Sequence, residues 1–264
     1  MKRLLYFSFV CCSLIFSVNS QAEVQVDKGM AQVDGETFHH SIAYDDAIAG
    51  KRPGIIVVHE WWGLNDYALK RMNMLAELGY VAIAIDMYGQ GKTVEHPKDA
   101  KALATELRKD MKGAADRFTV AMDTLKQHPQ VDAKNIAAIG YCLGGGVVLN
   151  MARKGMDLKS VVSFHGGLSS SIVPEKGGVK AKILVCHGEE DKSITAQIPE
   201  FEATMTQVGA DYELIIYPNA THSWTNPAAD QVAKNYNFPI RYNPWADRKS
   251  WADMLVFLDK HFTN

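Results

Sequence analysis

Short apolar runs recur along the chain between residues 55 and 217. Runs of this length with few polar side chains are typical of strands buried on both faces of a parallel sheet. Six such runs occupy residues 55–58, 81–85, 136–139, 161–164, 183–186 and 214–217. Residues 38–44 instead alternate apolar and polar side chains, which predicts an edge strand with one buried face.

Helical periodicity lies between these runs. Apolar residues three and four positions apart predict helices around residues 69–76, 118–125, 147–154, 198–208 and 251–262. Gly79 and Gly209 follow two of these stretches and are expected to end them. Because strands and helices alternate, we predict an α/β fold with a mainly parallel central sheet flanked by helices on both faces.

Residues 219–247 break this regular alternation. Prolines interrupt the segment at positions 227, 239 and 244. A connection of this length is uncommon in a compact domain, and such loops often cover a functional site. We therefore expect the segment to cover a cleft, either as a mobile lid or as a fixed wall.

The first 22 residues carry a different pattern. Met1-Lys2-Arg3 is basic, residues 4–18 are apolar, and Ser20 and Ala22 are small residues at positions −3 and −1 of a cleavage site. This pattern predicts a secretory signal peptide that is cut after Ala22, and hence an exported, periplasmic protein. The alternative is an uncut N-terminal anchor. Residues 23–264 are then expected to form a single domain.

The charge balance limits the classes of molecule that the chain is expected to bind. The chain has 28 Lys and Arg residues, and without Lys2 and Arg3 it has 26 against 30 acidic residues, a net charge of −4. No charged block is present, which argues against nucleic acid or a membrane surface as a partner. Phosphate-binding glycine patterns and metal-ligand spacing are also missing. A small-molecule substrate without a metal or cofactor is the remaining expectation.

Gly140-Tyr141-Cys142-Leu143-Gly144 joins the apolar run 136–139 to the helical stretch 147–154. A strand, a sharp turn between small residues and a helix form the context of a nucleophile elbow, with cysteine where serine is usual. Backbone N–H groups at the helix N-terminus favour a thiolate and can stabilise an oxyanion. The pattern predicts acyl transfer to the Cys142 sulfur.

Two further candidates follow later strands in the order nucleophile, acid, base. Asp191 lies after the run 183–186, and His222 lies after the run 214–217. Chain order and strand-end position are those expected of α/β-hydrolases, in which the acid orients the histidine and the histidine moves the proton. Glu189 and Glu190 are rival acids, and we favour Asp191 because it is closer to the following helix.

Glu60 follows the first buried run, at the rim of the same cleft. Its carboxylate is either a second base that helps to ionise the thiol or a structural cap. The N–H groups of Trp61 and Leu143 are the expected oxyanion hole. Trp61 and Trp62 either form apolar walls for the acyl group or pack in the core. We also expect Trp62, Trp224 and Asn226 to contact the substrate.

Together these segments resemble the dienelactone hydrolase family of α/β-hydrolases. The matching stretches are residues 59–65, 78–80, 140–145, 188–191 and 220–224. The resemblance implies a Cys142–His222–Asp191 triad, Glu60 as a helper carboxylate, hydrolysis of an enol lactone through a thioester, and no cofactor. Lactone-cleaving members hold the substrate carboxylate with arginines, whereas Asn226 stands near one such position and residues 87–97 contain no arginine. An ester, a differently shaped lactone or a thioester therefore fits equally well.

Three alternatives concern Cys142 directly. A disulfide with Cys186 is disfavoured because two strand spacings, about 9.6 Å, would separate the two cysteines. A redox role is disfavoured because no Cys-x-x-Cys motif is present. A non-catalytic scaffold that binds a ligand or a partner protein is the alternative to an enzyme.

Overall fold

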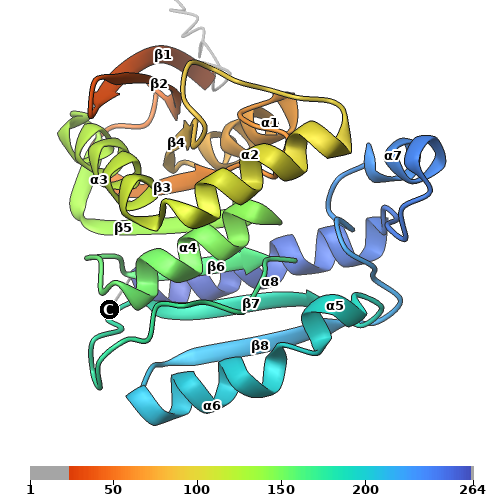
Figure 1. Ribbon diagram of the computed structural model, residues 1–264. Coiled ribbons are helices and arrows are strands. Elements are labelled where there is room, and N and C mark those ends of the chain that lie inside the picture. The colour runs from red at the N-terminus through yellow and green to blue at the C-terminus, as the bar shows by residue number, and fades with distance from the viewer. Residues whose placement is uncertain (1–23, 263–264) are drawn as a thin grey trace, which may run out of the picture.

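The computed structural model describes residues 24–262, which form one eight-stranded sheet in the order β1-β2-β4-β3-β5-β6-β7-β8 (Figure 1). The strands β3 to β8 run parallel, and β2 pairs antiparallel with both β1 and β4. This arrangement is the predicted α/β-hydrolase fold. The expected signal peptide, residues 1–22, lies outside the described residues.

All six apolar runs lie within strands, as predicted. The bounds of the strands are β1 (Val24–Val33), β2 (Glu36–Asp45), β3 (Arg52–Val58), β4 (Val81–Ile85), β5 (Val131–Tyr141), β6 (Ser160–Phe164), β7 (Lys182–Gly188) and β8 (Tyr212–Tyr217). The prediction that residues 38–44 form the edge strand is wrong, because β1 pairs along the outer side of β2. No buried residue lies in β1, so its sequence has no apolar run that would mark a strand.

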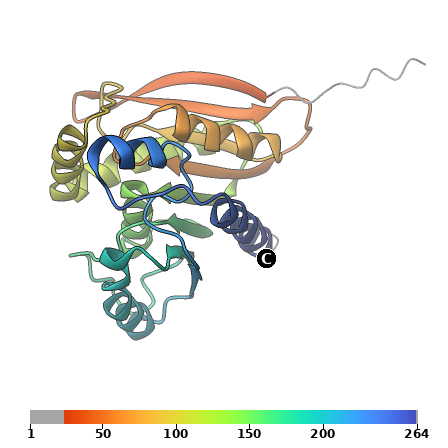
Figure 2. The ribbon, with the colours of Figure 1, turned by 90° about the vertical axis from the view of Figure 1, so that its right-hand side faces the viewer.

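Helices cover both faces of the sheet, as predicted (Figure 2). The bounds of the helices are α1 (Asp66–Glu77), α2 (Pro97–Lys109), α3 (Met111–Gln127), α4 (Leu143–Arg153), α5 (Lys192–Thr195), α6 (Ile198–Val208), α7 (Ala229–Tyr236) and α8 (Pro244–Phe262). Gly79 and Gly209 have φ of 91° and 72°, the left-handed conformation expected after a helix. No helix among residues 24–262 is both long and apolar enough to cross a bilayer.

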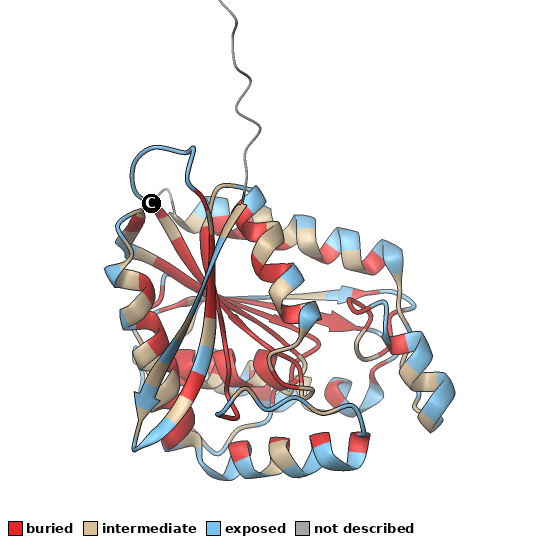
Figure 3. Ribbon diagram, turned by 90° about the horizontal axis from the view of Figure 1, so that it is seen from above, coloured by how far each residue is buried: buried red, intermediate tan, exposed pale blue. Residues whose placement is uncertain are grey.

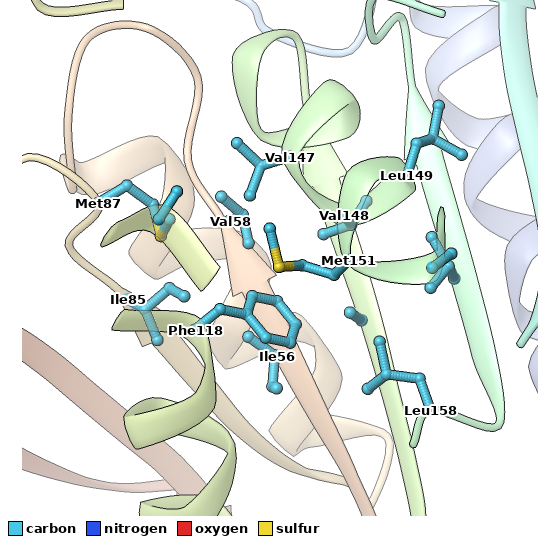
Figure 4. Close-up of a cluster of buried hydrophobic side chains, with 14 of the residues drawn as sticks. Ile56, Val58, Ile85, Met87, Phe118, Val147, Val148, Leu149, Met151 and Leu158 are labelled. Carbon is cyan, nitrogen blue, oxygen red and sulfur yellow. The ribbon is translucent and has the colours of Figure 1, made fainter. Parts of the chain in front are cut away.

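Two apolar clusters hold the helices against the sheet. Because successive residues of a strand point to opposite faces, Ile56 of β3 joins the cluster under α3 and α4, whereas Ile55 joins the cluster under α1 and α8. Figure 4 shows Phe118 of α3 and Met151 of α4 beside Ile56. Removing the buried Phe118 ring would cost about 3–5 kcal/mol. Figure 3 shows that the central strands are buried, whereas the outer faces of the helices are exposed.

The long segment 219–247 contains α7 and the first residues of α8. α7 projects from the body of the molecule at the side where β5, β7 and β8 end (Figure 1). In open parallel sheets the ligand site lies beyond the carboxyl ends of the strands. The fold therefore places this segment, as expected, over the edge that carries the candidate residues.

Candidate active site

Cys142 occupies a strained turn between β5 and α4. Its φ of 52° and ψ of −110° lie where residues other than glycine are rarely found. A side chain at Gly140 or Gly144 would press on backbone, with an added Cβ only 2.1 Å from Gly144 O or 2.3 Å from Val58 O. Small residues on either side are thus required, and the geometry is that of a nucleophile elbow. Holding such a residue costs about 1–3 kcal/mol, which the surrounding structure offsets.

Asp191 is the acid that reaches His222. His222 Nδ1 lies 2.6 Å from Asp191 Oδ2, and the Ser193 hydroxyl donates to the other carboxylate oxygen at 2.8 Å. The rival acids point elsewhere. Glu189 accepts a bond from the Asn219 N–H at 3.1 Å, and the exposed Glu190 pairs with Arg241 at 3.2 Å. The choice of Asp191 over its neighbours agrees with this geometry.

Charge couples these groups to Cys142. Burial lowers the pKa of His222, but the charge of the Cys142 thiolate and hydrogen bonds to Asp191 and Cys142 outweigh it and raise this pKa well above its ordinary value. Burial raises the pKa of Asp191, but the hydrogen bond to His222 outweighs burial and holds the pKa of this carboxyl below its usual range. The arrangement therefore favours the imidazolium form of His222 beside the Asp191 carboxylate.

Glu60 lies in the turn after β3 and is almost fully buried, with 2% of its surface exposed. Asn226 Nδ2 donates to Glu60 Oε2 at 2.6 Å. Burial raises the pKa of Glu60, and the Asn226 hydrogen bond and the charge of His222 offset only part of that effect. A carboxyl of this kind can take up a proton closer to neutral pH than an ordinary glutamate.

A cavity of about 530 Å³ joins these groups. Glu60, Cys142 and His222 line it, and much of the remaining wall is apolar. Trp61 and Trp62 line it, as do Asn226 and several residues of the segment 219–247, so this segment covers the site. The apolar wall beyond the tryptophans comprises Ile194, Ala228, Ala229, Val232, Phe238, Pro239 and Ile240.

Trp224 does not lie on the cavity wall. It is fully buried, its indole N–H donates to Ser250 Oγ at 3.4 Å, and its ring packs against His165 and Tyr217 at centroid distances of 4.9 and 5.7 Å. The expectation that Trp224 contacts the substrate is corrected by this position. An irregular loop has no periodic pattern that shows which of its side chains are buried. The sequence therefore did not predict that Trp224 belongs to the core.

Of the two expected oxyanion donors, Leu143 directly follows Cys142 and Trp61 shares a cavity with it. Leu143 is the first residue of α4, so its N–H has no acceptor within the helix, and it lines a second, smaller cavity together with Cys142. Trp61 lies on the main cavity, and its carbonyl oxygen is held by the Tyr88 hydroxyl at 2.9 Å. Cys142 and Cys186 are both free thiols, and β6 separates β5 from β7 as expected.

Sequence reasoning missed two residues near the nucleophile. Arg108, an exposed residue of α2, lines both cavities that contain Cys142. His165 is buried directly after β6, and its ring centroid lies 5.2 Å from that of His222. The rule that found Asp191 and His222, a polar residue after a buried strand, also applies to His165.

Comparison with known proteins identifies the family of this chain. The model of the "Dienelactone hydrolase family" matches residues 40–262. The chain belongs to the dienelactone hydrolase family. Within the family, it is 27% identical to the protein usf of Aquifex pyrophilus over 217 residues, which are 80% of this chain and 89% of that protein. It is 28% identical over 225 residues to a candidate 2-oxo-3-(5-oxofuran-2-ylidene)propanoate lactonase of Bradyrhizobium, which covers 81% of this chain and 86% of that protein.

Solved structures show the same relationship. A dienelactone hydrolase-like promiscuous phosphotriesterase from metagenomic libraries superposes with a TM-score of 0.85 at 29% identity, over 91% of this chain and 99% of that one. A dienelactone hydrolase candidate from Klebsiella pneumoniae shares the fold, with a TM-score of 0.76 at 22% identity, over 90% of this chain and 99% of that one. Family membership and the names of relatives support a lactone or ester hydrolase.

Proposed function

We propose that this protein hydrolyses a carboxylic ester, lactone or thioester through a Cys142–His222–Asp191 triad. One observation carries the proposal: the strained Cys142 turn and His222, which is held by Asp191 through a 2.6 Å hydrogen bond, line the same cavity. The thiolate attacks the substrate carbonyl carbon, and the N–H groups of Leu143 and Trp61 stabilise the resulting oxyanion.

His222 then moves the proton twice. It donates a proton to the leaving oxygen or sulfur as the tetrahedral intermediate collapses to an acyl-thioester on Cys142. A water molecule next attacks the thioester while His222 accepts its proton, and the carboxylic acid leaves. Asp191 keeps the imidazole in one tautomer and stabilises its cationic form.

Glu60 serves as the second base in this proposal. It lines the same cavity as Cys142, and its raised pKa suits a group that accepts the thiol proton when the substrate arrives and returns it to the sulfur once the acyl group has left. The neutral Asn226 amide holds the carboxylate without supplying a positive charge. Glu60 therefore remains basic enough to take the proton.

The cavity wall supports a substrate with an apolar or aromatic part. Trp61 and Trp62 pack with ring centroids 5.0 Å apart, and Phe238 lies 6.1 Å from Trp61. Arg108 adds one cationic group at the wall, where a substrate carboxylate could bind. The activity should therefore be tested on a panel of candidate substrates. This panel contains an enol lactone with a free carboxylate, a neutral lactone, an aryl ester, a thioester and a phosphotriester.

The expected signal peptide places this reaction outside the cytoplasm, in the periplasm, with a small molecule as the partner. Expression of the full chain followed by fractionation and N-terminal sequencing tests this location. A mature N-terminus at Glu23 in the periplasmic fraction supports it, and full-length protein in the cytoplasm contradicts it.

Replacing the nucleophile gives the largest expected change. Cys142→Ala should reduce the turnover of the reactive panel member to background while the far-ultraviolet circular dichroism spectrum stays unchanged. Cys186→Ala is the matched control, because this thiol is fully buried in β7 and should leave kcat near that of the parent. Undiminished turnover by folded Cys142→Ala would overturn the proposal.

A further inference from the structure

A second histidine, His165, accepts a hydrogen bond from the backbone N–H of Cys142. His165 is completely buried, and its Nδ1 lies 3.0 Å from the Cys142 nitrogen. The Phe164 carbonyl oxygen lies at the same distance from that nitrogen. The Cys142 N–H, which begins the strained turn, thus points to two acceptors at the end of β6.

This contact fixes the tautomer of His165. An Nδ1 that accepts a hydrogen bond carries no proton, so the proton of the neutral ring is on Nε2. Nε2 lies 2.7 Å from Thr225 Oγ1, which accepts that proton's hydrogen bond. Thr225 lies three residues after His222, in the same loop. One imidazole therefore connects the turn that carries the nucleophile to the loop that carries the base.

We call this connection from Cys142 through His165 to Thr225 the His165 bridge. Two residues of α1 hold its Thr225 end. Tyr67 Oη lies 2.6 Å from Thr225 Oγ1, and Arg71 donates to the Thr225 carbonyl oxygen at 2.7 Å. Arg71 also forms a buried ion pair with Asp247 at 2.5 Å. Thr225 is 1% exposed, so solvent does not compete for its hydroxyl.

From these contacts we infer that His165 is a positioning residue that sets the separation between the Cys142 sulfur and the His222 ring. The inference rests on the proposed function, because that separation matters only if the pair transfers a proton. Burial, together with the charges of His222 and Arg71, lowers the pKa of His165 well below its ordinary value. His165 thus stays neutral beside the imidazolium and does not compete with His222 for the proton.

Three substitutions separate hydrogen bonding from packing. His165→Asn keeps an acceptor near the place of Nδ1 but cannot reach Thr225, and His165→Gln keeps a donor near the place of Nε2 but offers Cys142 no acceptor. His165→Phe fills the space and removes both hydrogen bonds. If positioning of the Cys142 N–H dominates, the Asn variant is the most active of the three; if packing dominates, the Phe variant is.

Two readouts apply to each folded variant. The first is kcat and KM on the best panel substrate, and the second is the rate of Cys142 alkylation by iodoacetamide between pH 5 and 9. A misplaced nucleophile should lower kcat by about 10²-fold in the Phe and Gln variants, with KM little changed. Their alkylation profiles should shift relative to the parent, whereas the Asn variant should retain most of the parent kcat and profile.

The other end of the bridge gives an independent test. Thr225→Val keeps the shape but removes the acceptor for Nε2, and it should lower kcat without raising KM. Thr119→Val is the control, since its hydroxyl bonds only within α3, to the Ala115 carbonyl oxygen at 2.8 Å. Parent-like kcat and alkylation profiles in His165→Phe, or higher activity in Phe than in Asn, would overturn the inference. Alkylation needs no substrate, so this result is separate from turnover by Cys142→Ala, which tests the proposed function.

Discussion

The candidate active site holds two carboxyls in different ways, Asp191 behind His222 and Glu60 on the cavity wall. On the β7–α5 side, Asp191 caps a helix, accepts from Ser193 and pairs with His222, and its pKa is lowered despite burial. On the β3–α1 side, Glu60 is buried against the neutral amide of Asn226, and its pKa is raised. A charged partner and hydroxyl donors stabilise an anion, whereas burial beside an amide favours the acid. One site can therefore hold a fixed anion and, a short distance away, a proton acceptor.

Between the two carboxyls, the larger effect should come from the fixed anion, Asp191. Asp191→Asn leaves the shape but can hold His222 in the wrong tautomer, and we expect kcat to fall by about 10⁴-fold, the loss seen when a serine triad is changed in this way. Steady-state kinetics on the best panel substrate measure the loss. Glu190→Gln is the control, since this exposed neighbour pairs with Arg241 and not with His222. Equal losses in the two variants would contradict the assignment of the acid.

A smaller effect is expected on the opposite side. Glu60→Gln keeps a carbonyl oxygen that can accept from Asn226, but the amide cannot take up the thiol proton. Loss of a general base lowers kcat/KM by about 10²-fold, while folding and KM should change little. Kinetics identical to the parent would show that Glu60 is a structural residue. The proposed difference between Asp191 as a fixed anion and Glu60 as a proton acceptor would then be wrong.

The smallest effect is a difference in how stability depends on pH. The folded-state pKa of Glu60 is raised, so the folded protein binds more protons than the unfolded chain above the usual glutamate pKa of 4.5. The contribution of Glu60 to the free energy of unfolding should be full below pH 4.5 and fall as the pH rises through the folded-state pKa. Asp191 has the opposite sign, because its lowered pKa gives stability that is lost as the pH falls below 3.8.

Urea unfolding of the parent, Glu60→Gln and Asp191→Asn at several pH values isolates these contributions. The stability of the parent relative to Glu60→Gln should decline as the pH rises above 4.5. The stability of the parent relative to Asp191→Asn should instead decline below pH 3.8. Parallel curves for the two variants would show that the environments of the two carboxyls do not differ.

The parallel core of the fold could be predicted from local pattern because each buried strand carries its own apolar run. The strand β1 could not, since it has no buried residue and is held by backbone pairing with β2. The candidate triad could be predicted because polar residues that follow parallel strands meet at one sheet edge. Its order along the chain added a second constraint.

Contacts between distant residues were the part that sequence could not supply. Asn226 and Glu60 are 166 positions apart, and only the fold shows that the amide holds the carboxylate instead of facing the substrate alone. Trp224 is similar, because burial in an irregular loop leaves no periodic signal. The bridge from His165 to Thr225 joins two loops, so neither loop predicts it separately.

The central claim is that an acyl group is carried by the Cys142 sulfur during turnover. Mass spectrometry of enzyme quenched in acid within milliseconds of mixing with an aryl ester tests it directly. The account predicts one acyl adduct on the peptide that contains Cys142, formed as a burst with release of the phenol and absent from Cys142→Ala. Steady turnover with an acyl adduct on a different residue would contradict it.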